Sequence, residues 1–435
     1  MCTHMKKIVA IFFLLAASGL CRAQVPSGSW AGAIEIQGVS LALVFHLSDD
    51  KATLDVPDQG AKGIPVQVSL TPLGALHIDI AAINAAFEGY RIGEKIIGTF
   101  SQHGTSFPLT LSPGVPQRKR PQTPQPPFPY ATEAVGFNNG DAVLKGTLVL
   151  PESCDRTTPV LLMVTGSGLQ NRDEELFEHK PFAVIADYLA RRGVATLRYD
   201  DRGFGESTGD VVNVTTEDLK NDAAAGLALL RQRFDRVGVL GHSEGGTIAF
   251  MLAAEQKADF IVSLAGMVVS GRETLLAQNR YELQQAGLDA ATTERYCKAL
   301  AAVFDAAVEG LSMPDPASFE LPATLQQNLA AVQAQLQLPY LRYLLQLDLS
   351  SRLSVVSCPV LALNGTLDRQ VDCALNLGAL ERGLPASGKN VIRPFEGLNH
   401  LFQHAKTGAA AEYPQIEETF APEVLQAIAD WIAGL

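Results

Sequence analysis

The chain has few charged residues and no long run of basic ones. Asp, Glu, Lys and Arg make up 18% of its 435 residues, and the formal net charge is −12. Binding to phosphates needs clustered Lys and Arg, and the one basic cluster, Arg118-Lys119-Arg120, is short, so we expect no nucleic-acid partner. Apolar residues make up 47% of the chain, enough for a large core. Because a single core rarely serves more than about 250–300 residues, we expect two domains.

The signatures of zinc proteases, phosphate-binding loops and dinucleotide-binding folds are also absent, and the cysteines lack the spacing of metal ligands. We therefore expect no cofactor and no bound metal. No segment reaches the ~20 apolar residues that span a bilayer. The apolar stretch Ile8 to Leu20 follows Lys6-Lys7 and precedes Cys21-Arg22-Ala23, which is typical of an export signal cleaved after Ala23. We predict a signal peptide at residues 1–23 and an exported protein, periplasmic or extracellular, with no stable membrane insertion after cleavage.

Cleavage would remove two of the six cysteines and leave an even number in a compartment that permits disulfides. The remaining ones are Cys154, Cys297, Cys358 and Cys373. Cys358 is expected to begin a strand, and Cys373 to begin the helix beyond the far end of that strand. This arrangement exceeds the ~7 Å between α-carbons that a disulfide allows, so we predict that these two are not paired with each other.

Residues 24–111 show the pattern of a small antiparallel β domain. Apolar residues alternate with period two in short runs such as Leu41, Leu43, Phe45 and Leu47, and turn-rich pieces separate the runs. Closely spaced short strands indicate a sandwich or a small barrel. The aromatic residues of this domain alternate as core residues do, which argues against an exposed aromatic platform; they are Trp30, Phe45, Phe87 and Tyr90.

Residues 112–130 are rich in proline, at positions 113, 116, 121, 124, 126, 127 and 129. Proline removes a backbone donor and restricts the chain, so neither strand nor helix is expected there, and we predict an extended linker between the domains.

Beyond the linker, strands alternate with helices, which indicates a parallel sheet covered on both faces. We predict this α/β domain at residues 131–266 and 357–435. Its strands are expected at 160–164, 195–199, 237–240, 260–264, 360–363 and 391–392, and its helices at 182–191, 216–233, 247–255, 373–382 and 422–432. Residues 267–356 are expected to be helical throughout and to form a cap over the active site, or alternatively extra packing on the flank of the sheet.

Gly241-His242-Ser243-Glu244-Gly245 matches the Gly-x-Ser-x-Gly pattern, whose glycines permit a strained strand-to-helix turn that exposes the serine hydroxyl. An apolar strand precedes Ser243 and an apolar helix follows it. Ser207 lies in a similar pattern, but that stretch follows a charged turn and leads into no apolar helix. We therefore predict that Ser243 is a nucleophile.

A serine hydroxyl needs a base, and the base needs an orienting acid. After such an elbow the acid and the histidine follow in that order, on loops at the carboxyl ends of later strands. Asp368 is the predicted acid and His400 the predicted base. Asp372 competes with Asp368 but suits the N-cap of the next helix, and His404 competes with His400 if the loop is longer than expected.

The tetrahedral intermediate also needs backbone N–H groups aimed at its oxyanion. The N–H of Glu244, directly after the nucleophile, is the first predicted donor. The second is expected from the glycine-rich loop that follows the strand at 160–164, from Ser167 or from Gly168.

Together these motifs resemble the α/β-hydrolase superfamily from Thr132 to the C-terminus. Gly166-Ser167-Gly168 followed by Asn171-Arg172-Asp173-Glu174 is similar to a branch of exported bacterial carboxylesterases that carry an N-terminal β domain. The resemblance implies an α/β-hydrolase fold with a helical cap, preceded by a small all-β domain, and hydrolysis of short acyl esters. The chain departs from the superfamily by having Thr165 where a histidine commonly precedes the first glycine.

The sequence therefore predicts a serine esterase that hydrolyses small-molecule acyl esters through an acyl-enzyme intermediate. Two alternatives remain open. The same fold and triad occur in prolyl-oligopeptidase-like serine peptidases, and fold alone does not decide the substrate. The β domain could instead be the main functional unit and bind a glycan, with the hydrolase accessory to it.

Overall fold

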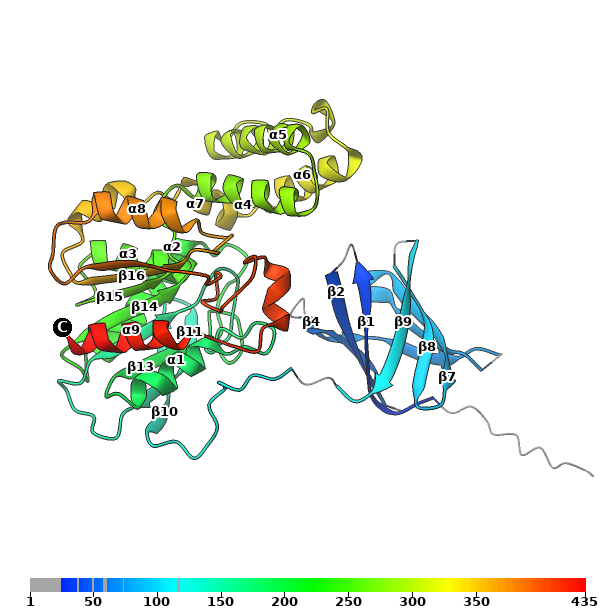
Figure 1. Cartoon of the computed structure of the whole chain (residues 1–435), viewed down its shortest axis with the longest axis horizontal. Helices are drawn as coiled ribbons and strands as arrows, with labels where there is room; N and C mark the ends of the chain where they lie inside the picture. Colours follow the sequence, from blue (N-terminus) through cyan, green and yellow to red (C-terminus); the bar gives the residue numbers. More distant parts are fainter. Residues whose placement is uncertain are drawn as a thin grey trace, which may run out of the picture. The chain divides into compact units, whose positions relative to one another are not determined.

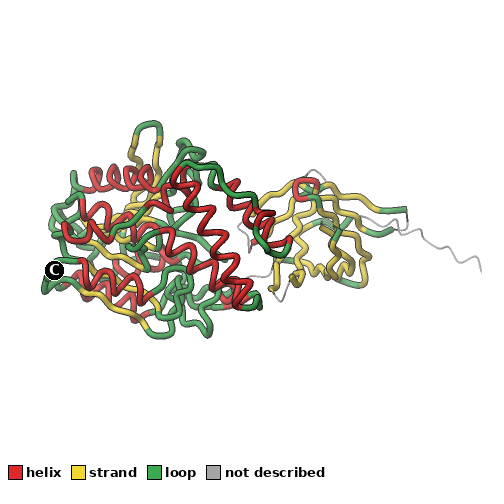
Figure 2. The backbone as a smooth tube through the Cα atoms, turned by 90° about the horizontal axis from the view of Figure 1, so that it is seen from above, coloured by secondary structure: helices red, strands yellow, loops and turns green. Residues whose placement is uncertain are grey.

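The computed structural model describes residues 25–36, 39–48, 51–57, 61–72, 74–102, 104–115 and 118–435. The predicted signal peptide and its cleavage site lie outside these residues. The chain divides into two compact units, residues 1–117 and 118–435. The first unit is built almost entirely of strands, whereas helices and strands alternate in the second (Figure 2). Among the described residues, no helix combines the length and the apolar character that crossing a membrane requires.

The N-terminal unit is an antiparallel sheet of nine described strands. In spatial order they are β4 (Ala61–Pro65), β3 (Thr53–Val56), β2 (Val39–Leu47), β1 (Gly28–Ile36), β9 (Thr105–Pro113), β8 (Lys95–Gln102), β7 (Ala85–Ile92), β6 (Leu76–Ile80) and β5 (Gln67–Leu70). The sheet curls so that strands far apart in this order face each other: Phe45 of β2 and Phe87 of β7 are 6.1 Å apart between ring centroids. A short 3-10 turn, Ala81–Ile83, follows β6.

The aromatic residues of this unit are not all in its core. Trp30, Phe45 and Phe87 are buried, but 46% of Tyr90 is exposed. The prediction that all four are core residues is therefore wrong for Tyr90. The physical reason is strand parity, since residues 87 and 90 lie on the same strand and an odd separation places them on opposite faces.

The proline-rich segment begins inside a strand, because β9 extends to Pro113 and its last two residues pair with β1. The expectation that no strand forms in this segment is therefore wrong at residues 112 and 113, whereas residues 118–130 form neither strand nor helix. Residues 118–130 are nevertheless bound to other parts of the chain. The Arg120 guanidinium donates to the carbonyl oxygens of Phe177 (2.8 Å) and Ile416 (2.9 Å). Gln122 donates to the Phe420 carbonyl (2.7 Å). The C-terminal part of the predicted linker is thus bound along the second unit.

The second unit contains an eight-stranded sheet. Its spatial order is β10 (Ala131–Asn139), β11 (Ala142–Leu150), β13 (Ala195–Tyr199), β12 (Val160–Val164), β14 (Val237–His242), β15 (Ile261–Leu264), β16 (Val360–Gly365) and β17 (Val391–Phe395). Only β11 runs against its two neighbours. This order, with a reversed second strand, is that of the α/β-hydrolase fold, so the predicted fold class is confirmed. The sequence analysis did not predict the hairpin β10–β11, because neither strand is a continuous apolar run like the parallel strands: β10 has one buried residue and β11 alternates.

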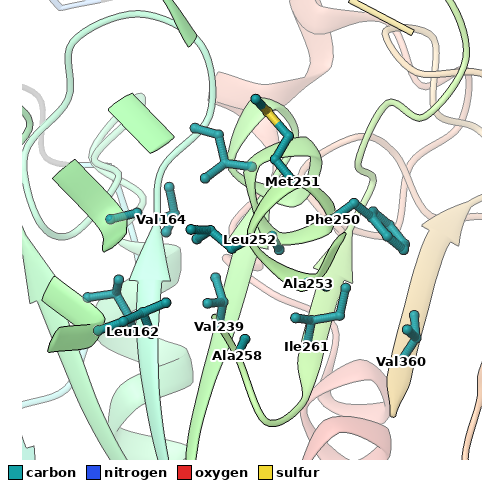
Figure 3. Packing of buried hydrophobic residues seen from close by; sticks show 14 of the residues in the cluster. Leu162, Val164, Val239, Phe250, Met251, Leu252, Ala253, Ala258, Ile261 and Val360 are labelled. Carbon is teal, nitrogen blue, oxygen red and sulfur yellow. The ribbon is translucent and has the colours of Figure 1, made fainter. Parts of the chain in front are cut away.

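Helices cover both faces of this sheet. α2 (Thr216–Leu230), α3 (Glu244–Ala254) and α8 (Cys373–Gly383) lie on one face, and α1 (Pro181–Ala190) and α9 (Pro422–Ala433) on the other (Figure 1). Leu162 of β12 packs into the first face and Leu161 into the second, as the strand period requires. Figure 3 shows the side chains of α3 lying over β12, β14 and β15, which fixes the helix that begins directly after Ser243.

A helical insertion separates β15 from β16. It consists of α4 (Gly271–Gln285), α5 (Ala290–Glu309), α6 (Ala323–Gln335) and α7 (Pro339–Gln346), with short 3-10 turns at Pro316–Ser318 and Ser350–Val355. These helices share a small core of their own that includes Leu300, Phe304 and Leu329. The insertion lies on the same side of the sheet as α2, α3 and α8 (Figure 1).

The four cysteines of the described residues, Cys154, Cys297, Cys358 and Cys373, all carry free thiols. Burial raises the pKa of the Cys358 and Cys373 thiols to about 11. Within the described ranges, no group of three or more His, Cys, Asp or Glu side chains is placed to hold a metal ion.

Candidate active site

Ser243 lies at a strained turn between β14 and α3. Its φ of 52° and ψ of −117° are unfavourable for a residue with a side chain. The two glycines of the motif make the turn sterically feasible: a β-carbon at Gly241 would collide with the Gly245 carbonyl, and one at Gly245 with the Val164 carbonyl. The Ser243 N–H donates to the Leu264 carbonyl (2.8 Å), which ties the turn to the next strand. Ser243 remains half-buried and not fully enclosed.

The predicted acid and base form a buried pair. His400 Nδ1 is 2.8 Å from Asp368 Oδ2, and both side chains are almost fully buried. The other oxygen of Asp368 accepts the N–H groups of Gln370 (2.8 Å) and Val371 (2.9 Å). Because a carboxylate oxygen accepts, His400 carries its proton on Nδ1, and Nε2 is left with the lone pair that a general base needs.

The loops that carry Asp368 and His400 are joined directly. The Leu367 N–H donates to the Leu398 carbonyl (2.9 Å). A β-carbon at Gly365 would overlap that same carbonyl, so only glycine permits this approach. The pairing of acid and base thus depends on the contact between the loops after β16 and β17.

His400 contacts His242, the residue that precedes Ser243. The rings of His242 and His400 are 4.8 Å apart between centroids, and His242 Nε2 lies 2.9 Å from the His400 carbonyl oxygen. In the described part of the chain, no hydrogen bond joins the Ser243 hydroxyl to the His400 imidazole. Such bonds are often long without substrate and shorten in the reacting complex.

The loop after β12 lies beside the nucleophile. A β-carbon at Gly166 would be 3.2 Å from Ser243 Cβ. The Gly166 N–H donates to Glu174 Oε1 (2.7 Å). The N–H groups of Ser167 and Gly168 donate no hydrogen bond within the described residues. This arrangement fits either of the two predicted second oxyanion donors.

Thr165 takes a structural position in place of the histidine common in the superfamily. Its hydroxyl donates to the Asp201 carboxyl (2.9 Å), which also accepts the Gln170 N–H (2.8 Å). Burial raises the pKa of Asp201 to about 8, with smaller contributions from the charges of Glu244 and Glu174. Thr165 therefore holds the start of the loop that carries the predicted second oxyanion donor.

Glu244 has a buried carboxyl in addition to its predicted backbone role. The carboxyl accepts hydrogen bonds from the hydroxyls of Thr216 (2.6 Å) and Tyr340 (2.5 Å). Burial raises its pKa, and these hydrogen bonds reduce the rise. Because Tyr340 belongs to α7, the helical insertion contacts the residue that follows the nucleophile.

The insertion also reaches the acid loop. Gln278 of α4 donates to the Gln370 carbonyl (2.6 Å), two residues after Asp368. The insertion therefore contacts both the residue that follows Ser243 and the loop that carries Asp368.

The competing residues have other partners. The Ser207 hydroxyl donates to the Asp200 carbonyl (2.7 Å) and accepts the Lys145 N–H (2.9 Å). Asp372 caps α8 by accepting the Leu375 N–H (2.7 Å). His404 is exposed and pairs with Glu418 and Glu423.

Sequence reasoning missed the functional potential of His242, Glu174, Asp201 and Tyr340. The first two lie inside motifs that were noticed for other reasons, namely the elbow and the Asn-Arg-Asp-Glu stretch. A signal was available for Glu174, since an acidic residue in a glycine-rich loop beside a serine elbow suggests a buried partner. Nothing in the sequence pattern pointed to Tyr340.

Comparison with known proteins places this site in a family. The model of the X-Pro dipeptidyl-peptidase (S15) family matches residues 139–391, which is more than half of the chain. The esterase EstD of Thermotoga maritima is 33% identical over 147 residues, covering 33% of this chain and 35% of that protein. An acyl transferase of Photobacterium leiognathi is 31% identical over 106 residues, covering 24% of this chain and 34% of that protein. The chain thus spans about a third of the length of the curated relatives it matches.

Among solved structures, the esterase Pf2001 of Pyrococcus furiosus aligns with a TM-score of 0.44 and 14% identity, covering 74% of this chain and 99% of that one. The family match includes the strand-to-helix turn at Ser243, the loop after β12, the helical insertion and the Asp368 loop. The chain belongs to the X-Pro dipeptidyl-peptidase (S15) family, and its second unit has the α/β-hydrolase fold.

Proposed function

We propose that this chain is an exported serine esterase that hydrolyses small acyl esters, with Ser243 as nucleophile, His400 as general base and Asp368 as the acid that orients His400. The observation that carries the proposal is the buried His400–Asp368 pair at 2.8 Å beside a serine held in a strained elbow. Strained backbone at an exposed hydroxyl persists only where the surrounding structure enforces it, and it is concentrated at functional sites.

In this mechanism Nε2 of His400 takes the proton of the Ser243 hydroxyl as its oxygen attacks the ester carbonyl. The backbone N–H of Glu244, with that of Ser167 or Gly168, binds the oxyanion. The imidazolium then gives its proton to the leaving alcohol, and an acyl-serine remains. Water attacks the acyl-serine with the same base, releases the acid and restores Ser243.

The ester preference is supported by the relatives. One curated relative is an esterase and others are acyl transferases, and both activities use an acyl-enzyme of this type. No cofactor takes part in such a reaction, and the proposed partner is a small-molecule ester.

The second candidate is a peptidase, and the family match favours it. The same triad can cut an amide bond after proline if the site binds the peptide in place. Parallel assays on p-nitrophenyl acetate and on an aminoacyl-prolyl anilide distinguish the two. The esterase proposal expects a much higher kcat/KM on the ester, and a higher value on the anilide would replace it with the peptidase.

The test of the nucleophile is Ser243→Ala. We expect ester hydrolysis to fall by more than about 10³-fold with the unfolding midpoint little changed, because the hydroxyl supplies the bond to the acyl group. Ser207→Ala is the matched control, since it removes a hydroxyl from the other Gly-x-Ser-x-Gly stretch and should keep kcat. An active Ser243→Ala protein would exclude Ser243.

Export through residues 1–23 is part of the proposal. N-terminal sequencing of the protein secreted by a bacterial host tests it, and a start at Gln24 is expected.

A glycan-binding role of the β unit is a further candidate, and the exposed Tyr90 is the feature that favours it. Pull-down of the full chain on insoluble polysaccharides, with Tyr90→Ala as comparison, tests that role.

A further inference from the structure

A second buried histidine–carboxylate pair lies directly behind the proposed triad. His242 Nδ1 is 2.9 Å from Glu174 Oε1, and His242 Nε2 is 2.9 Å from the His400 carbonyl oxygen. The side chains of His242 and Glu174 are 8% and 6% exposed. The proposed mechanism uses neither side chain.

The acceptors around His242 determine where its protons lie. The His400 carbonyl oxygen can only accept, so Nε2 of His242 carries a proton. A second proton lies between Nδ1 and Glu174 Oε1, and the same oxygen accepts the Gly166 N–H at 2.7 Å. Burial lowers the pKa of His242, but the charge and hydrogen bond of Glu174 outweigh burial, and the net effect raises it.

The pair therefore joins three segments whose relative positions must be fixed for the proposed reaction. Gly166 belongs to the oxyanion loop, His242 to the nucleophile elbow and His400 to the base loop. Phe182, Leu264 and Phe420 line a small cavity together with His242 and Glu174. Hydrogen bonds to charged groups are stronger in such apolar surroundings, so the three segments are held stiffly.

The backbone at Glu174 is shaped for this contact. Its φ of 53° lies in the left-handed region, which is unfavourable for a residue with a side chain. The preceding residues anchor it: Asn171 Oδ1 accepts the Asp173 N–H (3.0 Å), and the Arg172 guanidinium binds the Asp200 carboxyl (2.7 Å). The Asn-Arg-Asp-Glu stretch thus holds a strained residue whose carboxyl reaches the site.

We infer that Glu174 and His242 are positioning residues for the hydrolysis, which hold the oxyanion loop and the His400 backbone at fixed distances from Ser243. The inference rests on the proposed function. Neither residue touches substrate in this account. Their contribution is geometric, since a displacement of about 1 Å in a catalytic group can cost about 10²-fold in rate.

The two ring nitrogens of His242 can be tested separately. Gln places an amide near the position of Nε2 and can still donate to the His400 carbonyl. Asn places an amide near the position of Nδ1 and can reach Glu174 but not His400. We expect His242→Gln to keep kcat within about 5-fold of the original protein and His242→Asn to lower it about 10–100-fold, with KM within about 3-fold in both.

Glu174→Gln tests the other end of the pair. The amide oxygen of Gln can still accept both N–H groups, but it lacks the negative charge that strengthens the hydrogen bonds to His242 and Gly166, so kcat should fall about 10-fold. Because both residues act through one network, the double variant with His242→Asn should lose little more than the worse single variant. The rate at which a fluorophosphonate labels Ser243 should fall in parallel, because labelling uses the same elbow and base.

Asp222→Asn is the matched control. Asp222 is a buried acid that binds Arg202 (2.6 Å) and has no contact with the oxyanion or base loops in the described structure. It should lower the unfolding midpoint and leave kcat unchanged.

Two results would overturn the inference. One is an unchanged kcat for both His242→Asn and Glu174→Gln. The other is an equal loss of kcat in His242→Asn and His242→Gln that parallels the fall in their unfolding midpoints. Such a result would mean that His242 contributes only through packing. Failure of the proposed function is a separate outcome, because it would appear as activity that persists in Ser243→Ala. It would not appear in the kcat values of the His242 and Glu174 variants relative to the original protein.

Discussion

At the scale of single residues, three buried carboxyl groups contact the loop after β12 or the residues beside it. Glu174, Asp201 and Glu244 are all buried near one another, and only Glu174 has a basic side chain as partner. Hydroxyl and N–H donors from Thr165, Gln170, Thr216 and Tyr340 satisfy the others. Buried acids without a cation favour the protonated form, which makes this region sensitive to pH.

Asp201→Asn should therefore change the pH dependence of stability. The pKa of Asp201 is raised to about 8 by burial, so the stability that its protonated form contributes is complete below the unfolded pKa of about 4 and is lost as pH rises toward 8. The Asn side chain does not ionise, so the variant does not lose this stability as pH rises. We expect its free energy of unfolding to improve relative to the original chain by at most about 1.4 kcal/mol per pH unit across this window.

Urea unfolding of both proteins from about pH 4 to about pH 9 measures the difference. A difference that stays constant with pH would show that Asp201 is ionised in the folded protein throughout.

At the scale of elements, the strand and helix positions of the hydrolase unit follow from local pattern. The apolar run at 160–164 is β12, and the predicted helix 422–432 is α9 with Pro422 at its first position. The same pattern placed Ser243, Asp368 and His400 at the carboxyl ends of strands. It did not reveal β10 and β11, because β10 has one buried residue and β11 alternates buried residues with more exposed ones instead of forming a continuous apolar run.

The joint between the acid and base loops depends on one glycine, so Gly365→Ala should separate them. Its β-carbon would meet the Leu398 carbonyl, and overpacking of this kind costs about 1–3 kcal/mol. Because Asp368 and His400 lie on either side of that contact, we expect kcat for ester hydrolysis to fall as well. Gly388→Ala is the control, since a β-carbon there meets nothing within 4 Å.

Both variants can be compared by thermal unfolding and by p-nitrophenyl acetate hydrolysis. Equal values of kcat for the two would mean that the loops tolerate the shift.

At the scale of the whole molecule, the chain has two units with separate cores, and part of the predicted linker belongs to the second. Arg120 and Gln122 bind backbone carbonyls and N–H groups at 414–420 and the carbonyl of Phe177. The division between the units, between Gln117 and Arg118, falls inside the predicted linker of residues 112–130, and the part of the linker after it is bound to the second unit.

Two truncated proteins test this. A chain that begins at Arg118 should keep ester hydrolysis and nearly the original unfolding midpoint of the hydrolase unit. A chain that begins at Ala131 should be less stable by a few kcal/mol, at about 1 kcal/mol for each hydrogen bond lost. Matching midpoints for the two would show that the segment contributes nothing to the unit it lies on.

The sequence by itself determined the α/β-hydrolase class, the serine elbow and the candidates Asp368 and His400, because period, glycine placement and chain order are local properties. Only the tertiary structure decided that Thr165 serves Asp201, that Tyr340 of the insertion reaches Glu244 and that Glu174 pairs with His242. Those contacts join residues 36 to 96 positions apart. No local pattern encodes such contacts, because they exist only once the strands are aligned and their loops meet at one edge of the sheet.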